Sequence, residues 1–219
     1  GLHAAHELRL DDGEYAHVVH RDVSPENIFV TYSGIAKVVD FGVARSKAQT
    51  QERTATGELK GKVAYMSPEQ VHETPLDRRT DVWALGVVLW EITTGRRLFR
   101  RKSDAATVFA VLRDPVPKPE RFRPGFPEEL ERVIARALER DTTQRYQSAL
   151  ELARALELFL AHSGGVAGAG EVSEYMESLF ADEMAFREQL LRSVHDDAPV
   201  ENVTQLWQTG NQGAVLEAL

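Results

Sequence analysis

The sequence contains no cysteine, and this absence excludes several kinds of site. A chain without cysteine has no disulfide framework, no thiolate ligand for a metal and no cysteine nucleophile. The sequence also has no apolar run near the roughly 18 residues that a transmembrane helix needs. The longest such run, residues 82–94, is interrupted by Glu91. Both absences fit a cytoplasmic protein, which is the location we expect.

Basic residues are in the minority, with 26 Lys and Arg against 34 Asp and Glu, for a formal net charge of −8. A nucleic-acid-binding domain typically shows a basic surface, so we expect no nucleic-acid partner. The hydrophobic fraction of 42% is ordinary for a globular protein and is sufficient for a buried core. A length of 219 residues allows one large domain with an appendage.

The residues that carry chemistry gather in the octapeptide His-Arg-Asp-Val-Ser-Pro-Glu-Asn, which starts at residue 20. It contains a possible general base, Asp22, and a possible metal ligand, Asn27. The tripeptide Asp-Phe-Gly begins 18 residues after Asp22, at Asp40. Two runs rich in β-branched residues separate the clusters and predict the strands of a hairpin: residues 28–31 and 35–39. The two polar clusters are therefore expected side by side at the open end of one hairpin.

Apolar periodicity predicts helices over much of the remaining chain. Residues 80–94 are apolar on nearly every side, which is typical of a buried helix. This helix opens with a Thr-Asp capping signal, and Gly95 ends it. Leu2, Ala5 and Leu8 predict a helix at the start of the chain. Amphipathic helices are expected at four further ranges: residues 103–113, 127–140, 148–162 and 172–194.

Residues 163–170, Ser-Gly-Gly-Val-Ala-Gly-Ala-Gly, have the composition of a flexible linker. A phosphate-binding loop would need a Gly-Lys-Ser/Thr sequence and a preceding strand, and the sequence has neither here. We therefore expect one domain over residues 1–162, a linker over 163–170, and an amphipathic helix with a tail over 171–219.

The motifs resemble those of the eukaryotic-like serine/threonine protein kinases of bacteria, with H-R-D-x-x-x-x-N, then D-F-G, then Ser-Pro-Glu at the end of the activation segment. The resemblance covers roughly residues 1–160. It implies an α+β, mainly α-helical fold: the large C-terminal lobe of a protein kinase, here with a C-terminal helical appendage. It also implies an enzyme that transfers a phosphoryl group from ATP, with Mg²⁺, to Ser or Thr of a protein substrate.

The same resemblance implies roles for individual residues of the site. Asp22 would be the base that accepts the proton of the substrate hydroxyl. Asn27 and Asp40 would hold magnesium, and Phe29 would lie under the adenine ring. One such Asp or Asn alone is more often a turn residue, so the interpretation depends on the joint pattern.

Supporting roles are implied for five more residues. His20 and Phe41 resemble members of the hydrophobic column that aligns active kinases. Asp81 would accept hydrogen bonds from the backbone of the catalytic loop. Glu69 would pair with a distant arginine, for which Arg145 is the natural candidate.

Arg21 is the residue that, in the family, receives a phosphate carried by the activation segment. Thr54 and Thr56 are the best-placed acceptors for that phosphate, and Thr50 is a weaker one. A phosphothreonine there could order the segment through charge-assisted hydrogen bonds. Each threonine taken alone is equally compatible with a polar loop.

Two positions depart from the family pattern. The residue two positions after the base is usually Lys but is Ser24 here, and the Thr that usually follows a Gly near the segment's end is Lys62 here. We expect that Lys62 reaches back to the place of the missing lysine, with Ser24 as its hydroxyl partner, because losing that cation should weaken transition-state stabilisation. The alternative is a solvated loop lysine beside a degenerate site.

A basic run follows the buried helix and would favour acidic substrates if it borders the peptide groove: Arg96, Arg97, Arg100, Arg101 and Lys102. The alternative is a solvated face without a ligand.

The sequence has no Gly-rich loop, no V-A-I-K lysine and no helix glutamate to pair with that lysine. We therefore expect a fragment that is inactive alone and that needs the missing small-lobe sequence as a partner. The rival hypothesis is a pseudokinase-like protein-binding module, with the 172–194 helix as its partner-binding element.

Overall fold

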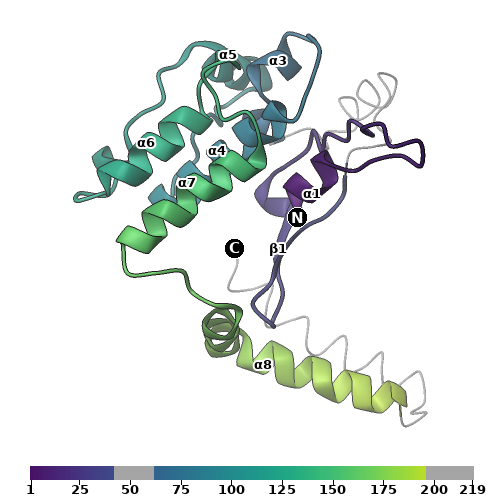
Figure 1. The fold of residues 1–219 in the computed structure, drawn as a ribbon. Coiled ribbons are helices and arrows are strands. Elements are labelled where there is room, and N and C mark those ends of the chain that lie inside the picture. The colour runs from purple at the N-terminus through teal and green to yellow at the C-terminus, as the bar shows by residue number, and fades with distance from the viewer. Residues whose placement is uncertain (42–61, 196–219) are drawn as a thin grey trace. The chain divides into compact units, whose positions relative to one another are not determined.

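The computed structural model describes residues 1–41 and 62–195. The chain divides into two compact units (Figure 1). The main unit comprises residues 1–29 and 36–166. The C-terminal unit comprises, of the described residues, 30–35 and 167–195.

Helix α4 (Arg79–Thr94) is the centre of the main unit, as the apolar sequence predicts. Helices α6 (Glu128–Ala137) and α7 (Ala149–His162) pack against it (Figure 1). The α4 side chains Trp83 and Trp90 are fully buried. A Cβ on Gly86 would lie only 2.9 Å from the Cβ of Ala137, so glycine allows the close approach of α4 and α6. The expectation of a mainly helical fold around a buried helix is confirmed.

The C-terminal end of α4 agrees with the prediction from the sequence, and its N-terminal end does not. Gly95 takes a left-handed φ of 66° at the C-terminal end, as expected of a glycine that stops a helix. The prediction of a Thr-Asp cap at the other end is wrong, because α4 begins at Arg79 and Thr80 and Asp81 lie inside its first turn. Their side chains are buried and bond to residues outside the helix.

Helices α5 (Asp104–Arg113) and α7 begin one residue later than expected, because Ser103 and Ser148 are their caps. Each serine hydroxyl accepts a hydrogen bond from the backbone N–H three residues on. The shorter helical segments of the main unit are α1 (Leu2–His6), α3 (Pro68–Val71) and the 3₁₀ turns η1 (Pro25–Asn27), η2 (Lys62–Tyr65) and η3 (Pro119–Arg121).

The first helix is shorter than its apolar pattern predicts. Helix α1 ends at His6, and Leu8 lies outside it with 54% of its surface exposed. The chain turns there instead, and a backbone bridge joins Arg9 to Tyr15. The Arg9 guanidinium lies 4.0 Å from the centre of the Tyr15 ring, so this contact replaces the expected helical turn.

The predicted hairpin is present, with strands β1 (Ile28–Val30) and β2 (Ala36–Val38). The N–H of Gly34 donates to the Thr31 carbonyl at 2.9 Å, and Gly34 has a φ of 76°, which favours glycine. At the open end, the Val39 N–H donates to the Asn27 carbonyl at 3.0 Å. This bond holds the two motif-bearing ends of the hairpin together.

The C-terminal unit consists of α8 (Ala169–His195) and the hairpin tip. Helix α8 begins three residues before the expected 172, and its helical geometry is interrupted at Phe180. The Ser173 hydroxyl donates to the Tyr32 carbonyl at 2.6 Å. Neither α8 nor any other helix in the described ranges combines the length and apolar character required to cross a bilayer.

Candidate active site

Asp22 lies at the centre of the site, and only 9% of its surface is exposed. The Asn27 amide nitrogen donates to the Asp22 backbone carbonyl at 2.7 Å and to its carboxylate at 3.2 Å. The ammonium of Lys62 lies 2.8 Å from the same carboxylate. The structure therefore brings Lys62 to Asp22 across 40 residues of sequence.

Ser24 is 1% exposed, and its hydroxyl has no hydrogen-bond partner within the part of the chain that is described. Lys62 bonds to Asp22, and the expected hydrogen bond between Lys62 and Ser24 is not formed. Buried hydroxyl groups in proteins are usually hydrogen-bonded, so an unpartnered one inside a site is a feature to explain.

Asp40 and Asn27 flank the open end of the hairpin. Asp40 has a φ of 58°, an uncommon left-handed conformation for a residue with a side chain, and its side chain is exposed. Carboxylate and amide oxygens are ligands that Mg²⁺ accepts, usually together with waters and substrate phosphates. Within residues 1–41 and 62–195 no cluster of three or more His, Cys, Asp and Glu could hold a metal. The pair Asn27 and Asp40 thus suits a cation that is shared with a phosphate ligand.

The conformation of the catalytic loop is held by Asp81 in the first turn of α4. Its carboxylate accepts the backbone N–H groups of His20 and Arg21, each at 2.8 Å. Arg21 has a φ of 66°, and the amide of Gln70 donates to its carbonyl at 2.9 Å. The loop therefore keeps a strained backbone because α4 and α3 bind it on both sides.

His6 was not identified from the sequence, and it completes the environment of Asp81. Its Nε2 lies 2.7 Å from an Asp81 carboxylate oxygen, and both side chains are almost fully buried. No motif surrounds His6, so only a contact across 75 residues reveals its place.

The rings of His20 and Phe41 lie 4.5 Å apart between their centres, in the contact that the resemblance implies. The Nε2 atom of His20 lies 2.9 Å from the Val39 carbonyl oxygen. Phe29 lies on the hairpin with 55% of its surface exposed. The side chain of Arg21 is also exposed, whereas Thr50, Thr54 and Thr56 lie outside the described residues.

Glu69 and Arg145 meet as a two-pronged ion pair, with nitrogen–oxygen distances of 2.7 and 3.2 Å. Arg145 also donates to the backbone carbonyls of Arg79 and Glu139, and Thr80 donates to Glu69 at 3.0 Å. Burial alone raises the pKa of Glu69, but the hydrogen bonds and positive charge of Arg145 outweigh it and hold the pKa below its ordinary value.

A second network, which the sequence did not indicate, holds the turn that carries Lys62. The Tyr65 hydroxyl donates to the Glu91 carboxylate of α4 at 2.8 Å, and Arg97 donates to both groups. Burial, and then the neighbouring Glu91, raise the pKa of the Tyr65 phenol above its ordinary value. Turn η2 is thus attached to α4 three residues after Lys62.

The family model for the protein kinase domain matches residues 12–156. The chain belongs to the protein kinase family. The matched residues correspond to the mainly helical large lobe, and helix α8 lies beyond them.

Bacterial kinases are among its relatives. The tyrosine-protein kinase MasK of Myxococcus xanthus is 41% identical over 183 residues, which cover 84% of this chain and 28% of MasK. The serine/threonine-protein kinase PknB of Mycobacterium leprae is 39% identical over 67% of this chain and 23% of PknB. The serine/threonine-protein kinase PknD of Mycobacterium tuberculosis is 42% identical over 66% of this chain and 22% of PknD. This chain spans about a quarter of the length of these relatives.

Proposed function

We propose that this chain is the catalytic large lobe of a serine/threonine protein kinase. It would take part in transferring the γ-phosphoryl group of ATP to a Ser or Thr hydroxyl of a protein substrate. The observation that carries the proposal is the environment of Asp22, whose carboxylate is bonded to the Asn27 amide at 3.2 Å and to the Lys62 ammonium at 2.8 Å.

Phosphoryl transfer requires a protein mainly to position two substrates and to stabilise charge on phosphate oxygens. Asp22 would orient the substrate hydroxyl and accept its proton while the hydroxyl oxygen forms a bond to the γ-phosphorus. The bond from that phosphorus to the bridging oxygen breaks, and ADP leaves with the electron pair. Phe29, exposed on the hairpin, offers an apolar surface for the adenine ring.

Asn27 and Asp40 would hold magnesium, which supplies positive charge beside the phosphate oxygens of ATP. The Asn27 amide nitrogen already donates to Asp22, which leaves its carbonyl oxygen to face a cation. The exposed Asp40 carboxylate would be the second protein ligand. Arg21 would bind a phosphate on Thr54 or Thr56 and so regulate the site.

Lys62 would supply the cation that most family members place two residues after the base. Its ammonium is already at the base, and its side chain is only 22% exposed, so little reorganisation would be needed to contact a transferred phosphate. The unpartnered hydroxyl of Ser24 would donate a hydrogen bond to the same phosphate. The two positions would thus have exchanged an ammonium and a hydroxyl.

The exchange is tested by single and double substitution in the full natural gene product, assayed with ATP, magnesium and a protein substrate. Loss of one preorganised electrostatic contact commonly costs about 100-fold or more in turnover. We expect a loss of that size for Lys62→Ala. The double variant Ser24→Lys with Lys62→Thr restores the usual family arrangement. Its turnover should be at least about tenfold higher than that of Lys62→Ala.

Lys118→Ala is the matched control, since Lys118 is 77% exposed and its partner is Glu131, away from the site. It should leave turnover unchanged. Unchanged turnover in Lys62→Ala would contradict the role of Lys62. An absence of phosphate transfer by the natural protein to any substrate would contradict kinase activity itself.

The acceptor class is the finer part of this proposal, since the relatives include proteins named as serine/threonine and as tyrosine kinases. We infer Ser/Thr because the residues after Asp22 and the end of the activation segment differ from those of tyrosine kinases. Phosphoamino-acid analysis of a labelled substrate mixture decides the point. Phosphotyrosine as the main product would contradict the inference.

A protein-binding role remains the second candidate, favoured by exposed apolar side chains on α8. Tyr175 is 63% exposed and Leu179 is 53% exposed. A binding module without catalysis would tolerate Asp22→Asn with no change in its measured function. A kinase would lose phosphate transfer in the same variant.

A further inference from the structure

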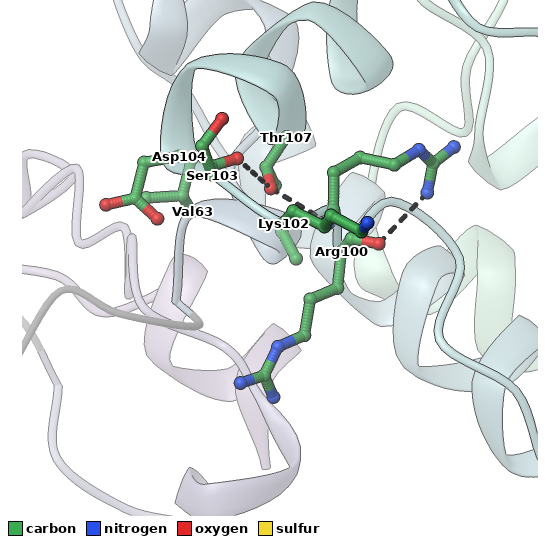
Figure 2. Close-up of a pocket in the computed structure, with 8 residues that line it drawn as sticks. Val63, Arg100, Lys102, Ser103, Asp104 and Thr107 are labelled. Carbon is green, nitrogen blue, oxygen red and sulfur yellow. Dashed lines mark hydrogen bonds between the residues drawn. The ribbon is translucent and has the colours of Figure 1, made fainter.

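A polar pocket with a volume of about 350 Å³ lies beside turn η2. Val63 and Ala64 form one wall, and residues 100–104 with Thr107 of α5 form the other (Figure 2). The backbone of this second wall is well bonded, because the Thr107 hydroxyl accepts the Arg101 N–H at 3.0 Å and donates to the Ser103 carbonyl at 2.9 Å. The pocket is therefore a built feature of the fold.

The three basic side chains of the pocket differ in whether they have a bonding partner. Arg101 is held by the Asp114 carboxylate at 2.7 Å and by the carbonyls of Leu98 and Arg100. Arg100 and Lys102 are exposed, and neither side chain forms an ion pair with any residue in the described ranges. Asp104 is the one carboxylate among the described residues of the lining. Figure 2 draws no hydrogen bond between the Arg100 side chain and the Asp104 carboxylate. Among the described residues, the pocket lining thus presents two cations without an ion-pair partner and one carboxylate.

The position of the pocket relates it to the phosphate acceptor. Its wall begins at Val63, the residue that follows Lys62, and Lys62 contacts the Asp22 carboxylate. An extended peptide advances about 3.3 Å per residue. The pocket therefore lies within a few residues' reach of a peptide whose hydroxyl is held at Asp22 and whose chain runs toward η2.

We infer that this pocket selects substrates with an anionic side chain, a carboxylate or a phosphate, within three residues of the phosphorylated hydroxyl. The inference rests on the proposed kinase function and names its substrate class. Arg100 and Lys102 supply the positive charge, and the small apolar side chains of Val63 and Ala64 leave room for the peptide. The formal charge of the whole chain is −8, so this local positive charge is not a general property of its surface.

The test uses the full natural gene product and a set of serine peptides with a single Glu or a single phosphoserine placed at each position from three before to three after the acceptor. An exposed ion pair contributes up to about 1 kcal/mol. We therefore expect at least one Glu peptide to exceed the all-alanine peptide about twofold to fivefold in kcat/KM. The Arg100→Glu and Lys102→Glu variants should lower or reverse this ratio.

Arg96→Glu is the matched control, because Arg96 belongs to the same basic run, is exposed and does not line the pocket. It should leave the ratio unchanged. A natural protein that phosphorylates acidic and neutral peptides equally well would overturn the inference, and so would a ratio that Arg96→Glu changes as much as Arg100→Glu does. A larger gain with phosphoserine than with Glu would identify the preferred anion as phosphate.

A binding measurement separates failure of the inference from failure of the kinase proposal. Fluorescence anisotropy of labelled Glu and alanine peptides with the same protein requires no turnover. Selective binding of the Glu peptide that Arg100→Glu abolishes would support the pocket even in a protein that transfers no phosphate. Equal binding of both peptides, together with normal phosphate transfer, would overturn the pocket alone.

Discussion

The buried Arg145 and the exposed basic run after α4 differ in whether their charge is neutralised. Arg145 is fully buried, and its guanidinium bonds to the Glu69 carboxylate and to two backbone carbonyls. The basic run that contains Arg100 and Arg101 is exposed, and part of its charge has no partner among the described residues. A buried arginine that is bonded to a carboxylate and to backbone carbonyls maintains the fold, whereas an exposed arginine without a partner remains available to a ligand.

The largest effect on stability is expected when Arg145 is removed. Arg145→Ala leaves the Glu69 carboxylate buried without its cation, and breaking a buried ion pair on one side costs about 3–5 kcal/mol. We expect a fall of that size in the free energy of unfolding, measured by urea denaturation. Arg132→Ala, an exposed arginine of α6, is the control and should change it by less than about 0.5 kcal/mol.

A double variant sharpens the result. Arg145→Met with Glu69→Gln removes both charges and should destabilise less than the sum of the two single variants, because no buried charge remains unpaired. A loss equal to the sum would show that the two residues act independently.

The second prediction concerns acid. The pKa of Glu69 is lowered in the folded protein, so the unfolded state takes up the proton first as the pH falls. The contribution of Glu69 to stability is therefore complete above its ordinary pKa of about 4.3 and is lost as the pH falls through the folded value. The difference in unfolding free energy between the natural chain and Glu69→Gln should stay constant above about pH 5 and shrink as the pH falls below about 4.3. A difference that stays constant down to about pH 3 would contradict the ion pair as its source.

The smallest effect is expected at the exposed pair of Arg101 and Asp114, whose atoms lie 2.7 Å apart with about a third of each side chain exposed. Exposed pairs contribute about 0–1 kcal/mol. Asp114→Asn should lower the free energy of unfolding by no more than that. Half a molar salt should reduce the difference further by screening. A loss comparable to that of Arg145→Ala would remove the distinction between the two regions.

Local patterns predicted most of the elements in the fold. The apolar run gave α4, the β-branched runs around Tyr-Ser-Gly gave the hairpin, and the Gly95 stop is where the pattern placed it. The error at the start of α4 arises because its side chains have distant partners. Thr80 and Asp81 look like caps in the sequence, but they bond to Glu69 and to the catalytic loop, so the helix starts before them.

The sequence by itself determined the family and the residues of the octapeptide, because these depend on the order of motifs along a short stretch of chain. By analogy with that family, it also named Arg145 as the partner of Glu69 and placed Lys62 at the site of the missing lysine. Only the tertiary structure decided that Lys62 meets Asp22 and not Ser24, that His6 supports Asp81, and that Val63 shares a pocket with Arg100. These contacts join residues 37 to 75 positions apart, and they exist because the packing around α4 brings those segments together.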